Sequence, residues 1–352
     1  MPPKNFLLAA HDPGGANVLM PLANRLSEQH SVLLFPGGPA IDIWKSLNSG
    51  PNLKTADGME IDEILMDALP DLIVTGTSLV SDFERLIWRL ARQSGRRTTA
   101  VLDASMNLER RFLSDIDEES NLPDAICAND PKAGQQLSSA KWCTARIHVT
   151  GQAYLEATIR NTQEIRSGRV CRPRPLMVFF SEPIATDHTG EQNPGYDQFS
   201  VATLLSKIIG DWGPVDVQIQ PHPREDKKIW LQWLENIRPP ENASFSIATA
   251  STDELLTQAD GIMGMTSMVL LQAALSGIPT ASFQPDRRLS LNQKLDETTE
   301  IIMATKTADS EYCIDKFFAA TKAGDRPMTK LSTALDGSIE RLFQAVMMEE
   351  GT

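Results

Sequence analysis

Cysteine is scarce in this sequence and is never arranged in pairs. Among 352 residues there are only four cysteines, and no two of them form a Cys-x-x-Cys motif. Such motifs are typical of zinc sites and redox centres, whereas dense cysteine spacing is typical of secreted disulfide frameworks. Neither class is indicated, and a reduced, cytoplasmic setting fits the composition best. The four residues are Cys127, Cys143, Cys171 and Cys313.

Long hydrophobic runs are also lacking. No apolar run approaches the roughly 18 residues that a membrane-spanning helix needs. The longest runs, Phe6–Ala10 and Met268–Leu275, are typical of a core strand and a core helix. The first residues carry one lysine and pass directly into a strand pattern, so no cleaved signal is expected.

Several motifs of other enzyme classes are missing. No Gly-x-Gly-x-x-Gly follows the first apolar run, and there is no Walker loop, which argues against NAD-dependent dehydrogenases and P-loop NTPases. The five histidines are too far apart for a His-Glu-x-x-His helix, so no metal site is proposed. Asp115-Ile116-Asp117 formally matches a metal-binding Asp-x-Asp motif, but it lies in an acidic stretch without a preceding strand and is interpreted as a solvated loop.

Basic residues are fewer than acidic ones, and the formal net charge is −13. Nucleic acids and anionic membranes are repelled by such a surface, so neither is a favoured partner. Binding of a small anionic ligand depends on the local charge of its site and not on the net charge, so such a ligand is not excluded.

What the sequence does contain is an alternation of short apolar runs with amphipathic stretches. From Val80 to Ala91 apolar residues recur at helical spacing, and Glu84 falls on the opposite, polar face with Asp82, Arg85 and Arg89. Strands separated by helices of this length indicate βαβ units and a parallel sheet. Strands are predicted in the first half at 6–10, 31–35, 71–75, 98–103, 124–128 and 147–149.

The stretch 166–175 interrupts this pattern, because it is basic, contains two prolines and has no periodicity. We interpret it as an interdomain linker, after which the alternation starts again. The prediction is therefore an N-terminal Rossmann-like domain at 1–165, a second at 176–329 and a C-terminal helix within 330–352. Strands are predicted in the second half at 176–180, 215–220, 244–248, 260–263 and 280–283.

Polar clusters follow three strands of the second half. Ligands of open parallel sheets bind at the carboxyl ends of strands, so these clusters are candidates for a binding site. They are Ser181-Glu182 after the first strand, residues 220–225 with His222 and Arg224 after the second, and Gly264-Met265-Thr266-Ser267 before an apolar helix.

The third cluster predicts a phosphate site. Free N–H groups and the dipole at a helix start attract phosphate, and Thr266 and Ser267 would add hydroxyl donors. The alternative is that Thr266 is only an N-cap. In the second cluster, flanking prolines hold His222 on an extended turn, and Arg224 is a natural phosphate partner; the alternative is a solvated surface turn. Together, the two clusters favour a phosphate site.

The order of these elements resembles the donor half of GT-B-type glycosyltransferases. The pieces are His222-Pro223, Thr252-Asp253, Asp260-Gly261, Thr266-Ser267 and Ala274 to Pro279. The His-Pro element is similar to that of bacterial capsule and sialic-acid transferases, in which it meets the nucleotide phosphate. The resemblance covers about residues 176–285. It implies two Rossmann-like domains that face each other across a cleft, and a C-terminal helix that returns to the first domain.

The first half resembles, more distantly, the non-hydrolysing UDP-N-acetylglucosamine 2-epimerases. The resemblance rests on His11-Asp12-Pro13-Gly14-Gly15 with Pro21-Leu22-Ala23, and on Val149 to Gln152. This sequence departs from the epimerase pattern, which has paired glycines after the serine of the donor helix, where Met268 and Val269 stand here. Many GT-B enzymes also have a ribose-binding glutamate on that helix, and this sequence has Gln272.

The loop after the first strand carries the candidate catalytic residues. His11 or Asp12 has suitable chemistry for a base that takes the acceptor's proton, and Asp103 is a weaker candidate of the same kind. The alternatives are that Asp12 caps the turn and that His11 is a satisfied loop histidine. The residues expected on the acceptor side are Gly14, Gly15, Asn17 and Asp103.

The combined prediction is a metal-independent glycosyltransferase without a cofactor, in which the nucleotide-sugar donor is a substrate and the acceptor is a small molecule or glycan. The alternatives are a nucleotide-sugar 2-epimerase or hydrolase, a glycerophosphate or phosphosugar transferase, and a non-catalytic nucleotide-sugar sensor, because fold does not fix function. The predicted donor-binding residues are Ser181, Glu182, His222, Arg224, Gly264, Thr266, Ser267 and Gln272.

Overall fold

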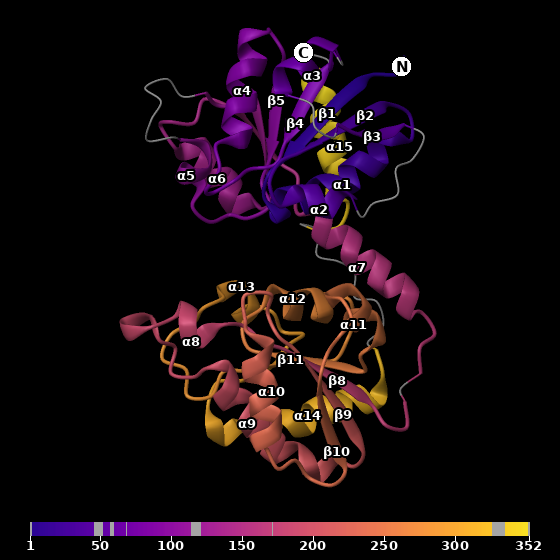
Figure 1. The fold of residues 1–352 in the computed structure, drawn as a ribbon, viewed down its shortest axis with the longest axis vertical. Coiled ribbons are helices and arrows are strands. Elements are labelled where there is room, and N and C mark those ends of the chain that lie inside the picture. Colours follow the sequence, from indigo (N-terminus) through magenta and orange to yellow (C-terminus); the bar gives the residue numbers. More distant parts are fainter. Residues whose placement is uncertain are drawn as a thin grey trace. The chain divides into compact units, whose positions relative to one another are not determined.

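The computed structural model describes residues 2–45, 52–56, 60–67, 69–113, 121–170, 172–325 and 335–350. The Asp115–Asp117 motif lies outside these residues. The chain divides into two compact units, Met1–Ala157 with Leu331–Thr352, and Thr158–Lys330 (Figure 1). Each unit is built around a parallel sheet. Among the described residues, no helix is long and apolar enough to cross a membrane.

The first unit contains a seven-stranded parallel sheet in the order β3-β2-β1-β4-β5-β6-β7. Its strands are β1 (Asn5–Ala10), β2 (Ser31–Pro36), β3 (Leu53–Thr55), β4 (Leu72–Thr75), β5 (Thr98–Val101), β6 (Ala125–Ala128) and β7 (Arg146–Val149). Its helices are α1 (Pro13–Ser27), α2 (Ala40–Lys45), α3 (Ile61–Asp67), α4 (Phe83–Gln93), α5 (Leu108–Phe112), α6 (Pro131–Ser139), α7 (Ala153–Arg166, which continues into the second unit) and α15 (Ser338–Glu350).

Helices cover both faces of this sheet, which explains why β1 is apolar at successive positions. Phe6 and Leu8 belong to the core cluster that contains α1, α2 and α15. Leu7 and Ala9 point to the opposite face and pack with α3 and α4. A strand with only one buried face would instead alternate apolar and polar residues.

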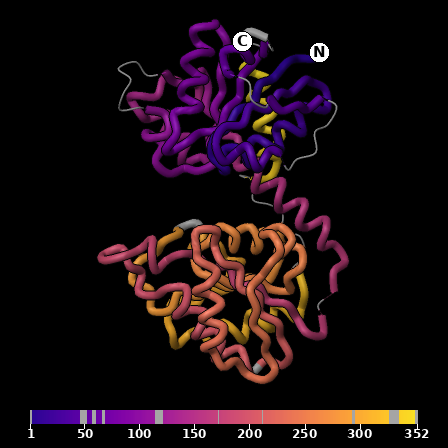
Figure 2. Tube along the Cα trace, viewed as in Figure 1, coloured from indigo at the N-terminus to yellow at the C-terminus, as the bar shows by residue number. Residues whose placement is uncertain are grey.

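The C-terminal helix α15 packs on α1 in the first unit, so the first strand and the last helix belong to one unit (Figure 2). Leu342, Phe343 and Val346 form its buried face, and the Arg25 guanidinium lies 4.3 Å from the centre of the Phe343 ring. The helix start is held by Glu156 of α7, whose carboxylate accepts hydrogen bonds from the N–H groups of Gly337 and Ile339.

The second unit contains a six-stranded parallel sheet in the order β10-β9-β8-β11-β12-β13. Its strands are β8 (Leu176–Phe180), β9 (Val215–Gln220), β10 (Ala243–Ile247), β11 (Gly261–Gly264), β12 (Thr280–Phe283) and β13 (Ile302–Ala304). Its α-helices are α8 (Ile184–Asp187), α9 (Gln198–Ile208), α10 (Lys227–Asn236), α11 (Thr252–Gln258), α12 (Met268–Leu275), α13 (Gln293–Asp296) and α14 (Ser310–Ala323). Met177 and Phe179 pack with α9, α10 and α14, whereas Val178 and Phe180 pack with α11 and α12.

The division between the units falls inside α7, between Ala157 and Thr158, and not within the stretch 166–175. The basic residues of that stretch bind to the second unit. Arg166 donates to the carbonyl oxygens of Leu256 and Ala259 at 2.8 and 2.7 Å, and its Nε lies 2.8 Å from a carboxylate oxygen of Asp325. Arg169 also donates to carbonyl groups at the end of α11. The last carbonyls of a helix have no partner within it, so guanidinium groups satisfy them.

The packing of α15 generates a stability prediction. Leu342 is fully buried against α1, so Leu342→Ala should destabilise the first unit by about 2–5 kcal/mol through lost burial and the cavity left behind. Met348 lies on the same helix and is 61% exposed, so Met348→Ala should change stability by less than about 1 kcal/mol. Urea denaturation measures both values, and equal effects would contradict the packing described here.

Candidate functional site

The candidate donor site lies at the carboxyl edge of the second unit's sheet. His222 follows β9 and Thr266 follows β11, but these two strands are not neighbours, because β8 lies between them and pairs with both. The loop that follows β8 begins with Ser181 and Glu182, and it therefore enters the site between the other two clusters. All three predicted clusters are brought to one edge by parallel pairing.

A cavity of about 280 Å³ connects these loops, and we call it the second-unit pocket. It contains five of the eight residues that the sequence predicts for donor binding, namely Glu182, His222, Arg224, Thr266 and Ser267. Its other lining residues are Pro183, Ile184, Asp187, His188, Met268, Leu291 and Asn292.

The loop after β9 is fixed by hydrogen bonds within the site. The Glu225 carboxylate accepts from the His222 N–H at 2.7 Å, and His222 Nδ1 accepts from the Arg224 N–H at 3.2 Å. The Arg224 guanidinium makes two hydrogen bonds to the Asp187 carboxylate, at 2.9 and 2.6 Å. Burial lowers the pKa of His222, and the neighbouring Arg224 lowers it further, whereas the hydrogen bonds from Arg224 lower the pKa of Asp187.

The start of α12 differs from the sequence prediction. Its N–H groups were expected to be open for phosphate, but the Glu182 carboxylate accepts from the Thr266 N–H at 2.6 Å and from the Thr266 hydroxyl at 2.9 Å. The backbone N–H of Ser267 also lowers the pKa of the Glu182 carboxyl group. The N-cap is Ser267 and not Thr266, because the Ser267 hydroxyl oxygen accepts from the Val269 N–H at 3.2 Å. A carboxylate of the protein thus occupies the expected anion position.

Three other predicted donor residues do not line the pocket. The Ser181 hydroxyl donates to Glu225 at 2.9 Å and so supports the β9 loop. Gly264 is buried within β11, where a side chain would meet the Phe180 carbonyl oxygen. A glycine at this position therefore allows β11 to pack closely against β8. Gln272 lies further along α12, and its buried amide nitrogen has no hydrogen-bond partner within the described part of the chain.

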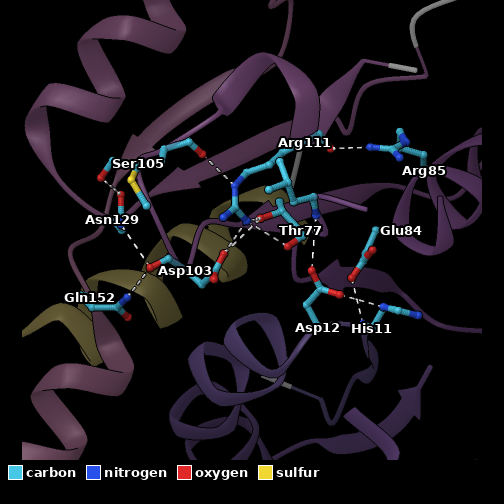
Figure 3. A network of polar contacts seen from close by, with 12 residues as sticks. His11, Asp12, Thr77, Glu84, Arg85, Asp103, Ser105, Arg111, Asn129 and Gln152 are labelled. Atoms are coloured by element: carbon cyan, nitrogen blue, oxygen red, sulfur yellow. Dashed lines mark hydrogen bonds and ion pairs between the residues drawn. The ribbon is translucent and has the colours of Figure 1, made fainter. Parts of the chain in front are cut away.

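The candidate acceptor-side residues lie at the carboxyl edge of the first unit's sheet (Figure 3). His11 and Asp12 follow β1, and His11 Nδ1 lies 2.8 Å from an Asp12 carboxylate oxygen. The other Asp12 oxygen accepts from the Leu79 N–H at 3.3 Å. Asp12 stands at the N-cap position of α1, but its side chain makes no capping hydrogen bond. The two side chains are about one quarter exposed, so they are accessible to a small ligand.

Asp103 belongs to a second cluster that the sequence analysis recognised only in part. Its carboxylate forms an ion pair of 2.7 Å with Arg111 and lies 3.4 Å from the Thr77 hydroxyl. Arg111 also donates to the carbonyl oxygen and hydroxyl of Thr77, at 3.1 and 3.0 Å. Its side chain is only 9% exposed, so this arginine is a structural partner that holds Asp103 in place. Arg111 lies on a short helix after β5, and no motif or periodicity in the sequence predicts its contact with Asp103.

Glu84 corrects one sequence expectation. The pattern placed it on the polar face of α4, but it is 1% exposed and accepts a hydrogen bond from the His11 N–H at 2.9 Å. Burial raises the pKa of its carboxyl group, and the hydrogen bond from His11 opposes this shift. The residue lies in the first turn of α4, which reaches the same sheet edge as the loop after β1. Helical periodicity does not reveal such a contact between separate elements.

Close backbone approach explains the two glycines after Asp12. A side chain at Gly14 would overlap the Asp103 carboxylate, and one at Gly15 would crowd the backbone at Gly76. These glycines let the first turn of α1 pack against the loops after β4 and β5. Asn17 lies in the second turn of α1 and is partly buried. Within the described ranges, no three His, Cys, Asp or Glu side chains gather as metal ligands.

Two α/β units with wholly parallel sheets, each with polar clusters at the carboxyl ends of its strands, are typical of the GT-B fold, and solved structures with this fold match 98–99% of the chain. Searches for a matching family model and a matching curated protein find none. The structure is similar to a Listeria monocytogenes protein proposed to be a UDP-N-acetylglucosamine 2-epimerase, with 13% identity, a TM-score of 0.67 and coverage of 99% of this chain and 98% of that chain.

Two further structures show the same fold. The UDP-GlcNAc 2-epimerase of Neisseria meningitidis, solved with UDP-GlcNAc, has 9% identity, a TM-score of 0.63 and coverage of 98% of this chain and 100% of that one. Anabaena HepE, solved with UDP-glucose, has 12% identity, a TM-score of 0.54 and coverage of 98% of both chains. These likenesses confirm the GT-B-like fold class expected from the sequence.

The Asp103–Arg111 pair can be tested against an exposed pair of the same chemistry. Asp103→Asn should cost roughly 3 kcal/mol of unfolding free energy, because it leaves the buried Arg111 charge without its partner. Asp216→Asn is the matched control, since the side chains of Asp216 and its partner Arg174 are 43% and 41% exposed. The control should cost less than about 1 kcal/mol. Chemical denaturation gives both values, and a control as costly as Asp103→Asn would argue against a structural role for the buried pair.

Proposed function

We propose that this protein is a glycosyltransferase that takes a sugar from a nucleotide-sugar donor and transfers it to an acceptor nucleophile. One observation carries the proposal: His222, Arg224, Thr266 and Ser267, which come from two separated strands, line a single pocket at the carboxyl edge of the second unit's sheet. Three proteins with this fold are named as binding UDP, UDP-GlcNAc or UDP-glucose in their solved structures, which supports a ligand of this class.

The second-unit pocket provides the chemistry that departure of a nucleotide requires. Negative charge develops on the leaving phosphate as the bond to the sugar breaks, and fixed positive groups near that phosphate lower the barrier. Arg224 carries a permanent charge and can bind phosphate with two parallel hydrogen bonds. Its side chain is 62% exposed, so exchanging Asp187 for a phosphate requires no unfolding of the loop.

The first unit provides the candidate base. Asp12 binds His11 Nδ1, and an acidic partner of this kind orients an imidazole and stabilises the imidazolium that forms when the ring takes a proton. His11 Nε2 would then be the atom that accepts the proton of the acceptor hydroxyl. The Glu84 hydrogen bond to the His11 backbone fixes the position of the residue.

A nucleotide-sugar 2-epimerase is the second candidate. It is favoured by the higher TM-scores of the two 2-epimerase-type structures, 0.67 and 0.63 against 0.54 for HepE. It is opposed by Met268 and Val269 at the start of α12, where the resemblance to epimerases implies paired glycines. An epimerase needs no acceptor. The two reactions therefore differ in the products that form when the protein is incubated with the nucleotide sugar and no acceptor.

Removal of the Arg224 guanidinium should weaken donor binding. Arg224→Ala loses a charge-assisted hydrogen bond worth on the order of 1.5–3 kcal/mol, which is about ten- to a hundredfold in affinity. The matched control is Arg238→Ala, since Arg238 is exposed just beyond the end of α10, where it donates to the carbonyl oxygens of Glu235 and Ile237. Calorimetric titration with UDP, CMP, CDP, GDP and their sugars measures the affinities, and equal affinity in Arg224→Ala and the parent would contradict the assignment of the donor half.

Substitution of the proposed base His11, or of its partner Asp12, should lower turnover and leave donor binding unchanged. His11→Ala and Asp12→Ala remove the base or its orienting partner, so we expect a fall in kcat of about 10²–10⁴-fold with donor affinity unchanged. Steady-state kinetics and donor titration of the same preparations give the two values. Loss of donor binding in His11→Ala, with binding retained in Arg224→Ala, would reverse the assignment of the donor and acceptor halves.

The products formed from the donor alone distinguish the two candidate reactions. A transferase should release little nucleotide until an acceptor is added, because its base acts on the acceptor's proton. Incubation with a nucleotide sugar, followed by chromatography and NMR of the sugar, should show unchanged donor. An epimerised sugar formed without acceptor would favour the second candidate.

A further inference from the structure

The phosphate-binding groups of the second-unit pocket are already paired with acidic side chains of the protein. Arg224 pairs with Asp187, the His222 backbone N–H pairs with Glu225, and the start of α12 pairs with Glu182. Of these acids, Asp187 lies near the surface and Glu225 supports the loop, whereas Glu182 occupies the helix start itself. A phosphate that approaches α12 therefore meets a fixed carboxylate.

The topology explains why Glu182 reaches this position. The strand β8 pairs with both β9 and β11. Glu182 is the second residue after β8, so it lies between the His222 loop and the first turn of α12. The first turn of α12 contains no acidic residue of its own. The positive end of its dipole is complemented by the carboxylate from the β8 loop, which takes up the geometry that an anionic ligand would need.

We propose that the Glu182 carboxylate competes with the phosphate of a nucleotide sugar for the start of α12, so that the phosphate binds there when Glu182 is protonated. The inference rests on the proposed function, because it takes a nucleotide sugar as the ligand of the second-unit pocket. When the nucleotide sugar binds, Glu182 therefore takes up a proton.

The surroundings of Glu182 favour proton uptake. Burial raises the pKa of its carboxyl group, the hydrogen bonds from Thr266 and Ser267 oppose this shift, and the nearby Glu225 charge raises the pKa again. Approach of a phosphate adds a further negative charge and raises the pKa more. The titratable and charged groups around Glu182 are Glu225, Tyr196, Asp187, His188, His222 and Arg224.

The sign of the pH dependence follows from this competition. An ionised Glu182 opposes phosphate and a protonated Glu182 does not, so affinity for the ligand rises as the pH falls. His222 acts in the same direction, because a protonated imidazole also attracts phosphate, although burial lowers its pKa. The contribution of Glu182 is therefore the part of the pH dependence that survives in His222→Asn and disappears in Glu182→Gln.

The direct test is titration of Glu182→Gln with UDP-glucose and UDP-N-acetylglucosamine, whose phosphates have no ionisation near neutral pH. At about pH 8 the variant should bind at least about tenfold more tightly than the parent, because a like charge beside the phosphate is removed. Between about pH 8 and pH 5 its affinity should change less than that of the parent.

Two variants serve as controls. Glu254 also caps a helix start, since its carboxylate accepts from the Ser251 N–H at 2.8 Å beside α11, but it does not line the pocket. Glu254→Gln should therefore bind like the parent. Asp187→Asn frees Arg224 and should bind more tightly than the parent, but it should keep the parent's dependence on pH.

The outcomes separate the inference from the proposed function. If Glu182→Gln binds no more tightly than the parent at about pH 8, while Arg224→Ala still weakens binding, the inference is overturned and the proposed function stands. If neither the parent nor any variant binds a UDP, CMP, CDP or GDP sugar at any pH, both fail.

A second measurement covers the case in which Glu182→Gln does not fold. Titration of His222→Asn at about pH 6, in two buffers with different ionisation enthalpies, measures the protons taken up on binding. We expect a value above zero and up to about one proton per ligand. Zero uptake would overturn the inference without any substitution at Glu182.

Discussion

The parallel pairing of β8 with both β9 and β11 is the constraint on which the candidate donor site depends. It places three loops side by side at one edge of the sheet, and it puts the loop of the middle strand between the other two. Parallel strands all end on the same side, so polar residues that are distant in the sequence must meet there. Glu182, His222 and Thr266 accordingly line one pocket.

The same constraint shapes the first unit. There β1, β4 and β5 are consecutive neighbours in the sheet, and the loops that follow them bring His11, Thr77 and Asp103 into one polar region (Figure 3). A buried charge is costly unless it is paired, and Arg111 and Asp103 meet this requirement. The close approach of Gly14 to Asp103 shows that α1 and the β5 loop pack as one assembly.

The two sites differ in how open their charged groups are. The Arg111 side chain is 9% exposed and the Arg224 side chain is 62% exposed. The buried arginine holds a carboxylate in position, whereas the exposed one can exchange its protein partner for a ligand. This difference supports the assignment of Arg224 to ligand binding and of Arg111 to positioning. Both arginines have carboxylate partners, so the pairing alone does not distinguish their roles.

The sequence by itself determined the parallel α/β architecture, because the length and spacing of apolar runs such as Phe6–Ala10 follow from burial of strands on both faces. It also identified the His222, Arg224 and Thr266 loops, since polar residues directly after a buried strand end at the ligand-binding edge. Only the tertiary structure decided that β8 lies between β9 and β11, that Glu182 fills the start of α12, and that Glu84 is buried beneath His11. The physical reason is that periodicity records the burial of each element separately, whereas strand order and contacts between loops arise from pairing across long distances in the chain.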